Sequence, residues 1–147
     1  MSVESPHRIL VLTDRTEPSP ALLSMLRARA DESPIAVRVL VPNPTRAEVR
    51  LLHPERHLAA EAAELALMFV QDVYEQATGS RVRTAVSLRH DPFEAVEEDL
   101  FGHDADEIVV AMSGGAQPAR RFHHQLAQRL VRTHLPVTVV GPSPALA

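Results

Sequence analysis

The chain has 147 residues, of which 45% are hydrophobic and 23% are charged, and its formal net charge is −4. A chain of this length forms one domain, residues 1–147, and buries about two-thirds of its surface. It contains neither cysteine nor lysine, which excludes disulfides, thiolate metal sites, cysteine nucleophiles and Schiff-base chemistry.

Charge and aromatic content also limit the partners. The sequence has no long run of one charge sign, and only 3% of its residues are aromatic. These features argue against nucleic acid or an anionic membrane surface as the main partner. The first residues lack a signal-peptide pattern, and no apolar run has the length needed to span a bilayer. We therefore expect a cytoplasmic protein with no nucleic-acid partner and no membrane partner.

The first elements in chain order are two strands joined by a helix. Residues 8–13 form a short β-rich run that ends at Asp14, and residues 35–41 form a second run that Pro42 closes. Both have the continuous apolar character of parallel strands that are buried on two faces. Between them, Ser19 is a candidate N-cap and Pro20 a first helical residue.

An irregular loop and the longest helix come next. Residues 42–55 carry prolines, an asparagine and charges, which predicts a loop. The helix that follows ends at Gly79. Its apolar positions predict one buried stripe, formed by Leu58, Ala62, Leu65, Ala66, Phe69, Val73 and Ala77.

The remaining segments predict three strands and two helices. Residues 81–88 alternate between polar and apolar, as expected for a strand near the sheet edge. Asp91 and Glu94 form a capping box for a helix at 93–102 that packs through Phe93, Val96 and Leu100. A buried strand at 108–112, a turn with Gly114 and Gly115, a helix at 120–133 and a strand at 135–140 complete the chain.

This order of elements predicts an α/β fold. Strands alternate with helices throughout, and crossover connections between parallel strands are right-handed. The expected architecture is an open, doubly wound, five-stranded parallel sheet of Rossmann-like type, with helices on both faces and strand order 3-2-1-4-5. In the last βαβ unit, the helix N-terminus next to the glycine turn offers backbone N–H groups to an anion.

The whole chain resembles the universal stress protein family. The resemblance covers residues 7–142 and depends on the joint order of several features. These are the first strand ending in Asp14, the second strand closed by proline, the long helix after a loop, the run His-Asp-Pro-Phe-Glu-Ala-Val at 90–96, the strand leading into Gly114, and the closing strand Leu-Pro-Val-Thr-Val-Val at 135–140. It implies a cytoplasmic stress-response module that acts by binding a nucleotide or a partner.

The resemblance also implies a nucleotide site with an altered phosphate end. ATP-binding members of the family carry three spaced glycines after the fourth strand, the last followed by serine or threonine. The matching positions here hold Ala111, Gly114, His124 and Gln125, so one of the three glycines remains, with Gly115 beside it. His124 and Gln125 put bulk where the family lets backbone approach phosphate. We therefore expect weak or absent binding of ATP or AMP, and no metal beyond nucleotide-bound magnesium.

Two arginines offer a substitute for the lost phosphate contacts. Arg120 and Arg121 lie at the start of the last helix, and an arginine fork can bind phosphate. A solvated basic turn is the plainer interpretation and the one we favour. At the adenine end, the family places an aspartate and a pocket-lining residue where this chain has Asp14 and Val41. A turn residue explains Asp14 equally well, and ordinary core packing is the interpretation that we favour for Val41.

The same resemblance implies a homodimer, because the last strand of family members pairs with its mate in a second subunit. Residues 135–140, Leu135 to Val140, fit this role, since an open apolar edge strand is an aggregation hazard. An unknown protein partner is also expected. We keep two alternatives open. One is a nucleotide-dependent enzyme, such as a slow ATPase or nucleotidyl transferase, and the other is a structural protein whose pocket is filled.

No residue pattern supports catalysis or a metal site. His123 and His124 are adjacent on a helix and point about a hundred degrees apart, so they cannot share an ion as an i, i+4 pair does. The acidic residues of the third helix, which are Glu94, Glu97, Glu98 and Asp99, are interpreted as a solvated face. Asp91 is explained by its capping role alone.

Overall fold

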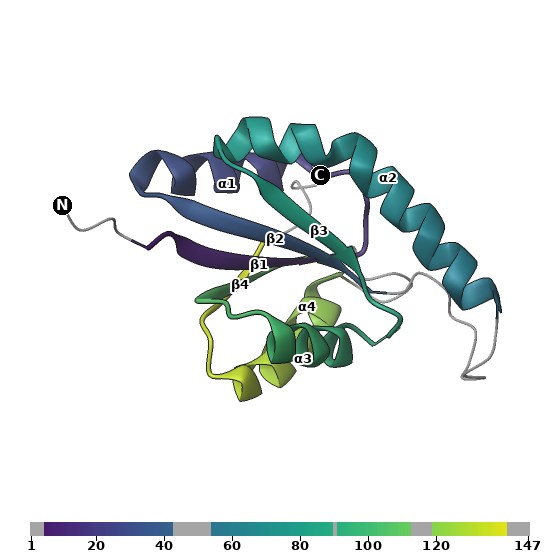
Figure 1. The fold of residues 1–147 in the computed structure, drawn as a ribbon. Helices are drawn as coiled ribbons and strands as arrows, with labels where there is room; N and C mark the ends of the chain where they lie inside the picture. The colour runs from purple at the N-terminus through teal and green to yellow at the C-terminus, as the bar shows by residue number, and fades with distance from the viewer. Residues whose placement is uncertain (1–4, 43–53, 90, 113–118, 141–147) are drawn as a thin grey trace, which may run out of the picture.

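The structure is a computed structural model that describes residues 5–42, 54–89, 91–112 and 119–140, with side chains described from residue 61 in the second helix and from residue 125 in the fourth. Its centre is a five-stranded sheet of order β3-β2-β1-β4-β5, in which every neighbouring pair is parallel (Figure 1). The strands are β1 His7–Thr13, β2 Ile35–Val41, β3 Val82–Val86, β4 Glu107–Ala111 and β5 Val137–Val139. The predicted topology and strand order are confirmed.

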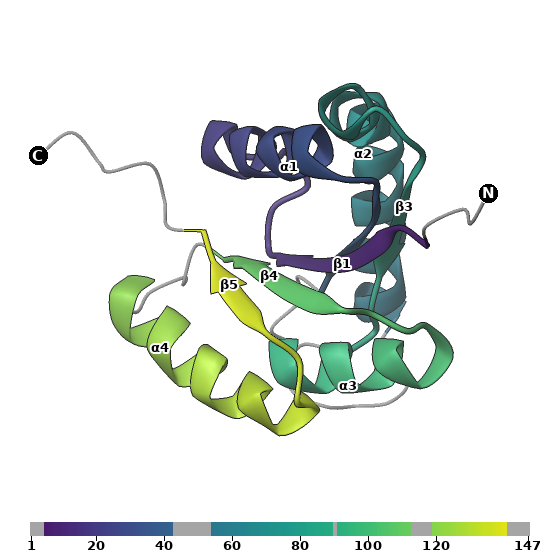
Figure 2. The ribbon, with the colours of Figure 1, turned by 90° about the vertical axis from the view of Figure 1, so that its left-hand side faces the viewer.

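Helices cover both faces of the sheet. They are α1 Pro20–Glu32, α2 Pro54–Thr78, α3 Pro92–Gly102 and α4 Ala119–Leu130, the last followed by a 3₁₀ turn at Val131–Thr133. Figure 2 shows α1 and α2 on one side of the sheet and α3 and α4 on the other. Because side chains alternate along a strand, Ile9 and Val11 pack towards α1 and α2, and Leu10 and Leu12 pack in the core under α3 and α4.

The helix ends follow the predicted capping signals. The Ser19 side chain accepts a hydrogen bond from the backbone N–H of Leu22 at 3.1 Å, and Asp91 accepts one from Glu94 at 3.2 Å. Proline occupies the first turn of each of these two helices. Gly79 has a φ of 72° and donates its N–H to the carbonyl of Glu75 at 2.8 Å, which ends α2 with a left-handed residue.

The predicted buried stripe of α2 is wrong in its position around the helix. Leu65, Phe69 and Val73 are 59%, 84% and 41% exposed. Ala77 of the predicted stripe is buried, but the other residues of α2 that pack on the sheet, which include Ala63, Leu67 and Tyr74, lie outside that stripe. Apolar residues occur around most of this helix, so the sequence allows more than one stripe at helical spacing.

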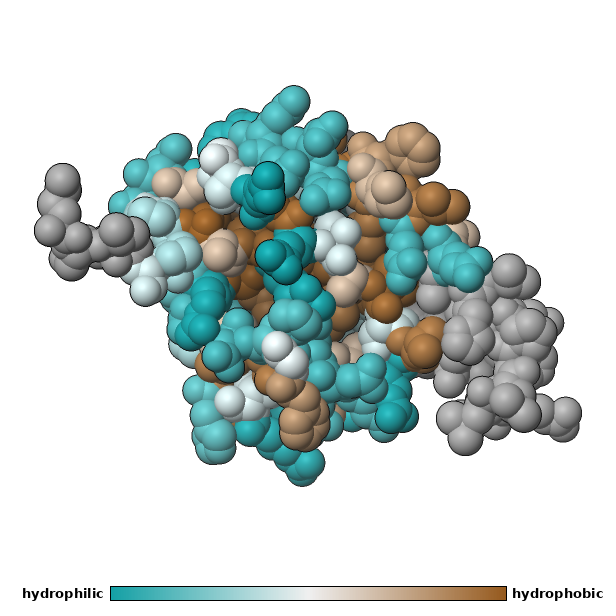
Figure 3. Space-filling model, viewed as in Figure 1, coloured by the Kyte–Doolittle hydropathy of each residue, from teal (hydrophilic) through white to brown (hydrophobic). Residues whose placement is uncertain are grey.

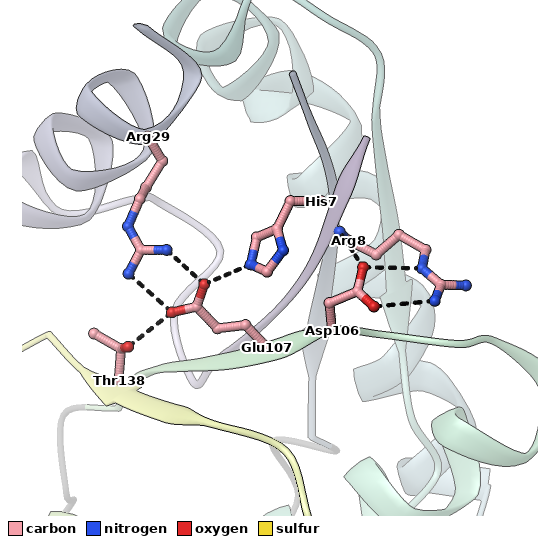
Figure 4. A network of polar contacts seen from close by, with 6 residues as sticks. All are labelled: His7, Arg8, Arg29, Asp106, Glu107 and Thr138. Atoms are coloured by element: carbon pink, nitrogen blue, oxygen red, sulfur yellow. Dashed lines mark hydrogen bonds and ion pairs between the residues drawn. The ribbon is translucent and has the colours of Figure 1, made fainter. Parts of the chain in front are cut away.

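A buried carboxylate ties four elements together near the amino ends of the strands (Figure 4). Glu107, at the start of β4, is 4% exposed. It accepts hydrogen bonds from Arg29 of α1 at 2.6 and 2.9 Å, from Thr138 of β5 at 2.8 Å, and it lies 3.0 Å from the Nε2 atom of His7 in β1. Burial works to raise the pKa of Glu107, but these hydrogen bonds outweigh it and lower the pKa.

A second carboxylate departs from its predicted solvated position. The Asp99 side chain is only 7% exposed, and it receives hydrogen bonds at 2.9 and 3.1 Å from Nε of Arg38 in β2. The interpretation of Asp99 as part of a solvated acidic face is therefore wrong. Arg38 lies in the middle of a buried strand, and a buried charge requires a partner of opposite charge. The sequence therefore signals that a carboxylate lies close to Arg38. On the neighbouring strand β1, Arg8 is the second residue and donates hydrogen bonds to Asp106 at 3.2 and 3.1 Å.

Candidate functional site: the carboxyl edge of the sheet

The strand order places a switch point between β1 and β4. The chain runs outward from β1 to β2 and β3 on one side, and from β4 to β5 on the other. Ligands of doubly wound sheets bind outside the carboxyl ends of the strands at such a point. Thr13 at the end of β1 is in register with Ala111 at the end of β4, so the predicted site residues Asp14 and Ala111 come from adjacent strand ends.

The connection after β1 has a defined shape that positions Asp14. Thr13 is 3% exposed, and its hydroxyl accepts a hydrogen bond from the backbone N–H of Arg15 at 3.2 Å. The same hydroxyl lies 3.4 Å from the carbonyl of Arg15, to which it can donate. These short-range contacts make a side-chain turn around Asp14, which is itself half-buried.

A cavity of about 840 Å³ lies between this connection and α2. One wall is formed by Asp14, Arg15, Thr16 and Glu17, and the other by residues of α2, which are Ala62, Ala63, Ala66, Phe69 and Val70. The volume is within the range of small-molecule sites, which is about 300–1,000 Å³. An apolar wall facing carboxylates suits a flat heterocycle with hydroxyl or amino groups that can donate hydrogen bonds.

The charge of this cavity suits the base of a nucleotide better than its phosphates. Two carboxylates, Asp14 and Glu17, and one guanidinium, Arg15, are present along the loop wall. The α2 wall carries no charged lining residue in the part of the chain that the structure describes. A phosphate group would be repelled by the excess carboxylate, so it would have to lie away from this wall.

The other predicted site residues are distributed differently. Val41 ends β2 and is 2% exposed in the core cluster that also contacts the half-buried Ala111. Gln125 is on α4 and exposed. Gly114 and Gly115 lie outside the described residues, and so do the side chains of three residues within the bounds of α4, namely Arg120, Arg121 and His124. Asp14 and Ala111 thus lie at adjacent strand ends. Among the described residues of the predicted site, only Asp14 lines the cavity.

The α2 wall is the part of the site that sequence reasoning missed. Ala62, Ala66 and Phe69 belong to the stripe that the spacing predicted as buried core. In the structure Phe69 is 84% exposed and borders the cavity. The sequence signal for this wall is the number of apolar positions on α2, which is larger than one packing face needs.

Among the described residues, no group of three or more histidine or carboxylate side chains is arranged to hold a metal ion. None of the described helices has both the length and the apolar character needed to cross a membrane. His103 lies 3.8 Å from Asp99 through its Nδ1 atom, and His134 adopts a left-handed backbone with a φ of 62°. Neither of these histidines lines the cavity.

No protein-family model and no curated protein sequence matches this chain. Solved structures do. A universal stress protein from Archaeoglobus fulgidus in complex with dAMP has 18% sequence identity and a TM-score of 0.58, covering 92% of this chain and 98% of that one. A crystal structure of a hypothetical protein has 16% identity and a TM-score of 0.65, covering 96% and 99%. A universal stress protein in complex with cAMP has 17% identity and a TM-score of 0.50, covering 95% and 100%. The chain has the fold of the universal stress proteins.

Proposed function

We propose that this chain is a cytoplasmic module of the universal stress protein type that binds an adenine nucleotide weakly through its base. The observation that carries the proposal is the cavity beside Asp14, which follows the carboxyl end of β1, one of the two strands at the switch point of the sheet. Two structural neighbours support it, since their structures are complexes with dAMP and cAMP. The base would lie against the apolar face of α2, and the Asp14 carboxylate would accept hydrogen bonds from the ribose or the base.

Weak affinity follows from the phosphate end. Two of the three glycine positions of the ATP-binding pattern hold Ala111 and His124. The loop wall of the cavity carries more carboxylate than guanidinium, which disfavours a polyphosphate near it. We therefore expect AMP to bind at least as well as ATP, because the second and third phosphates add charge without adding contacts.

A thermal melt of the desalted protein with AMP, ADP or ATP tests the proposal. A ligand at a hundred times its dissociation constant adds about 2.7 kcal/mol to the free energy of unfolding, which raises Tm by roughly 5 to 10 °C. Phe69→Ser and Asp14→Asn should each reduce this shift. Asp31→Asn on α1 is the matched control, since Asp31 is exposed and does not line the cavity.

Each outcome has a distinct meaning. An AMP shift that Phe69→Ser removes, with Tm of the free protein unchanged, supports binding between α2 and the β1–α1 connection. A shift that both cavity variants leave intact would place the nucleotide elsewhere and refute this site. The absence of a Tm shift with any of the three nucleotides would refute nucleotide binding. Release of phosphate from ATP would instead favour the alternative that the protein is a nucleotide-dependent enzyme.

We also propose that β5 joins two copies into a dimer. Among the described residues, β5 pairs with β4 on one side and with no strand on the other, and Val139 is 40% exposed. On the β4 side, the carbonyl of Pro136 accepts a hydrogen bond from the N–H of Ile108 at 2.9 Å. The N–H of Val140 donates one to the carbonyl of Val110 at 2.8 Å. Since successive backbone groups of a strand alternate in direction, the N–H of Val139 points to the open edge.

This geometry allows a variant that affects the edge alone. Val139→Pro removes an outward N–H and leaves the bonds of Pro136 and Val140 to β4 in place. We expect light scattering to show a dimer for the unchanged protein and for Val139→Thr, and a folded monomer for Val139→Pro. A monomeric unchanged protein, or a dimer that survives Val139→Pro, would contradict pairing through β5.

A further inference from the structure

A pocket rich in arginine lies at the end of the sheet opposite the candidate nucleotide cavity, on the face that α3 covers. Its volume is about 280 Å³. We call it the arginine pocket and define it by its arginine, aspartate and histidine lining residues, which are Arg8, Arg38, Arg81, Arg83, Asp99, His103 and Asp104. The view shared by Figures 1 and 3 shows apolar surface between hydrophilic side chains along the β3 edge.

Strand register explains why these arginines gather. Arg38 of β2 is directly opposite Arg83 of β3, and Leu10 of β1 is opposite Arg38. Leu10 belongs to the core cluster on the α3 side of the sheet, so Arg38 and Arg83 project to that side as well. Arg81 and Arg8 lie two residues before Arg83 and Leu10 respectively, which gives them the same orientation.

Two of the four guanidinium groups already have partners. Arg38 is held by Asp99, with Nη2 2.9 Å from Oδ1, and its side chain is 22% exposed. Arg8 is held by Asp106 at 3.1 Å and lies 3.4 Å from Asp104. The paired carboxylates fix these side chains and offset part of their charge.

The other two, Arg81 and Arg83, have no such partner. Both are exposed, and neither forms a hydrogen bond or ion pair with another residue in the ranges that the structure describes. Arg83 stands directly opposite Arg38, and like charges at opposed positions on neighbouring strands are destabilising. The chain as a whole has a formal net charge of −4, so this local excess of positive charge is contrary to its composition.

We propose that the arginine pocket binds a small phosphate-bearing compound, whose phosphate is held by Arg81 and Arg83. A phosphate monoester carries about −1.5 to −2 charges at pH 7, which matches the two unpaired guanidinium groups. Each guanidinium can donate two parallel hydrogen bonds to phosphate oxygens. The apolar lining, which includes Leu10, Val37 and Ala105, is suited to the carbon part of such a compound.

The size of the pocket favours a small compound over a macromolecule. A volume of about 280 Å³ is just below the usual range for small-molecule sites, which is about 300–1,000 Å³. The pocket lies towards the amino ends of β1 and β3, whereas Asp14 follows the carboxyl end of β1. It is therefore separate from the proposed nucleotide cavity, and the two share no lining residue.

Calorimetric titration with inorganic phosphate and with glycerol 3-phosphate, in a buffer free of other phosphate and sulfate, tests this proposal. Loss of charged hydrogen bonds should weaken binding of both probes by at least about tenfold in the double variant Arg81→Gln, Arg83→Gln. The matched control is the double variant Arg27→Gln, Arg132→Gln, which removes the same charge from exposed residues that do not line the pocket. It should bind as the unchanged protein does.

A second double variant separates this pocket from the nucleotide site. Arg120→Gln with Arg121→Gln removes the two arginines at the start of α4 and should leave phosphate affinity unchanged. The proposal is overturned if the unchanged protein binds neither probe, if Arg81→Gln, Arg83→Gln binds as tightly as the control, or if only the α4 variant loses affinity. The melting temperature of each variant without ligand verifies that it is folded.

Discussion

Replacing Glu107 by glutamine should destabilise this fold more than any exposed charge replacement. The Glu107 side chain is 5% exposed. It accepts hydrogen bonds from both terminal nitrogens of Arg29 and from the hydroxyl of Thr138. Glutamine has nearly the same shape but presents an NH₂ group to one of these donors. The substitution therefore leaves the Arg29 charge without its counter-ion and at least one donor facing another donor.

The magnitude follows from burial. Removal of one partner of a fully buried ion pair costs about 3–5 kcal/mol. The Arg29 side chain is 34% exposed, so water recovers part of this loss, and we expect about 2–3 kcal/mol. For a chain of this length, that difference lowers Tm by roughly 6 to 12 °C.

Glu107→Gln should also change how stability depends on pH. The pKa of Glu107 is lowered in the folded state, so its stabilising contribution is complete above the unfolded pKa of about 4.3 and is lost as pH falls through the folded value. The difference in Tm between the two proteins should therefore be largest near neutral pH and should narrow below about pH 4.

Thermal melts of both proteins from pH 7 to pH 3 make the measurement. Glu98→Gln is the control, because Glu98 and its partner Arg89 are each 56% exposed, and it should shift Tm by no more than about 2 °C. The assignment of stability to this network is refuted if the Tm of Glu107→Gln is within about 2 °C of that of the unchanged protein. It is also refuted if the difference in Tm between the two proteins does not shrink at low pH.

Three further predictions concern single side chains. Tyr74→Phe should raise the free energy of unfolding by up to about 1 kcal/mol in urea titrations, since the Tyr74 hydroxyl is buried without a hydrogen-bond partner among the described residues. A loss of stability would mean that the hydroxyl has a partner. Asp91→Ala should cost about 1–2 kcal/mol, because it removes the cap of α3 and the contact with Arg129 at 2.7 Å, whereas Asp91→Asn, which keeps the capping oxygen, should cost less. Equal losses would show that capping contributes little. Arg83→Gln should raise Tm slightly in phosphate-free buffer, because it removes the charge opposed to Arg38, and a fall in Tm would contradict that repulsion.

The sheet could be predicted from the sequence because its signals are local. Continuous apolar runs marked β1, β2 and β4, and the Ser19 and Asp91 caps set the starts of α1 and α3. Right-handed crossovers between alternating strands and helices then leave few topologies, and the expected order was the correct one.

The face of α2 could not be predicted in the same way. Its buried side includes Leu67 and Tyr74, and its exposed side includes Leu65 and Phe69. Both sets satisfy helical spacing, and only the tertiary packing of the helix on α1 and β3 selects between them. The same limitation hid the α2 wall of the candidate cavity, which is made from residues that spacing had assigned to the core.

Buried charge pairs were missed because their partners are distant in sequence. Arg38 and Asp99 are 61 residues apart, and Arg29 and Glu107 are 78 apart. A sequence shows that a buried strand contains a charge but does not identify the partner, which depends on how α1 and α3 dock on the sheet. In both pairs one member is on a strand and the other on a helix, so each pair also fixes the position of its helix.

The two ends of the sheet carry opposite chemistry, and this makes the proposals separable. Along the described lining of the cavity near the carboxyl end, Asp14 and Glu17 outnumber Arg15, whereas Arg81 and Arg83 give the pocket at the other end an excess of guanidinium. Variants that share no partners contribute additively, so Asp14→Asn should not change phosphate affinity at the arginine pocket, and loss of Arg81 and Arg83 should not change an AMP-dependent melting shift. Binding of one nucleotide across both ends would require its base and phosphate to be separated by the length of the sheet. A single ligand therefore cannot account for both sites.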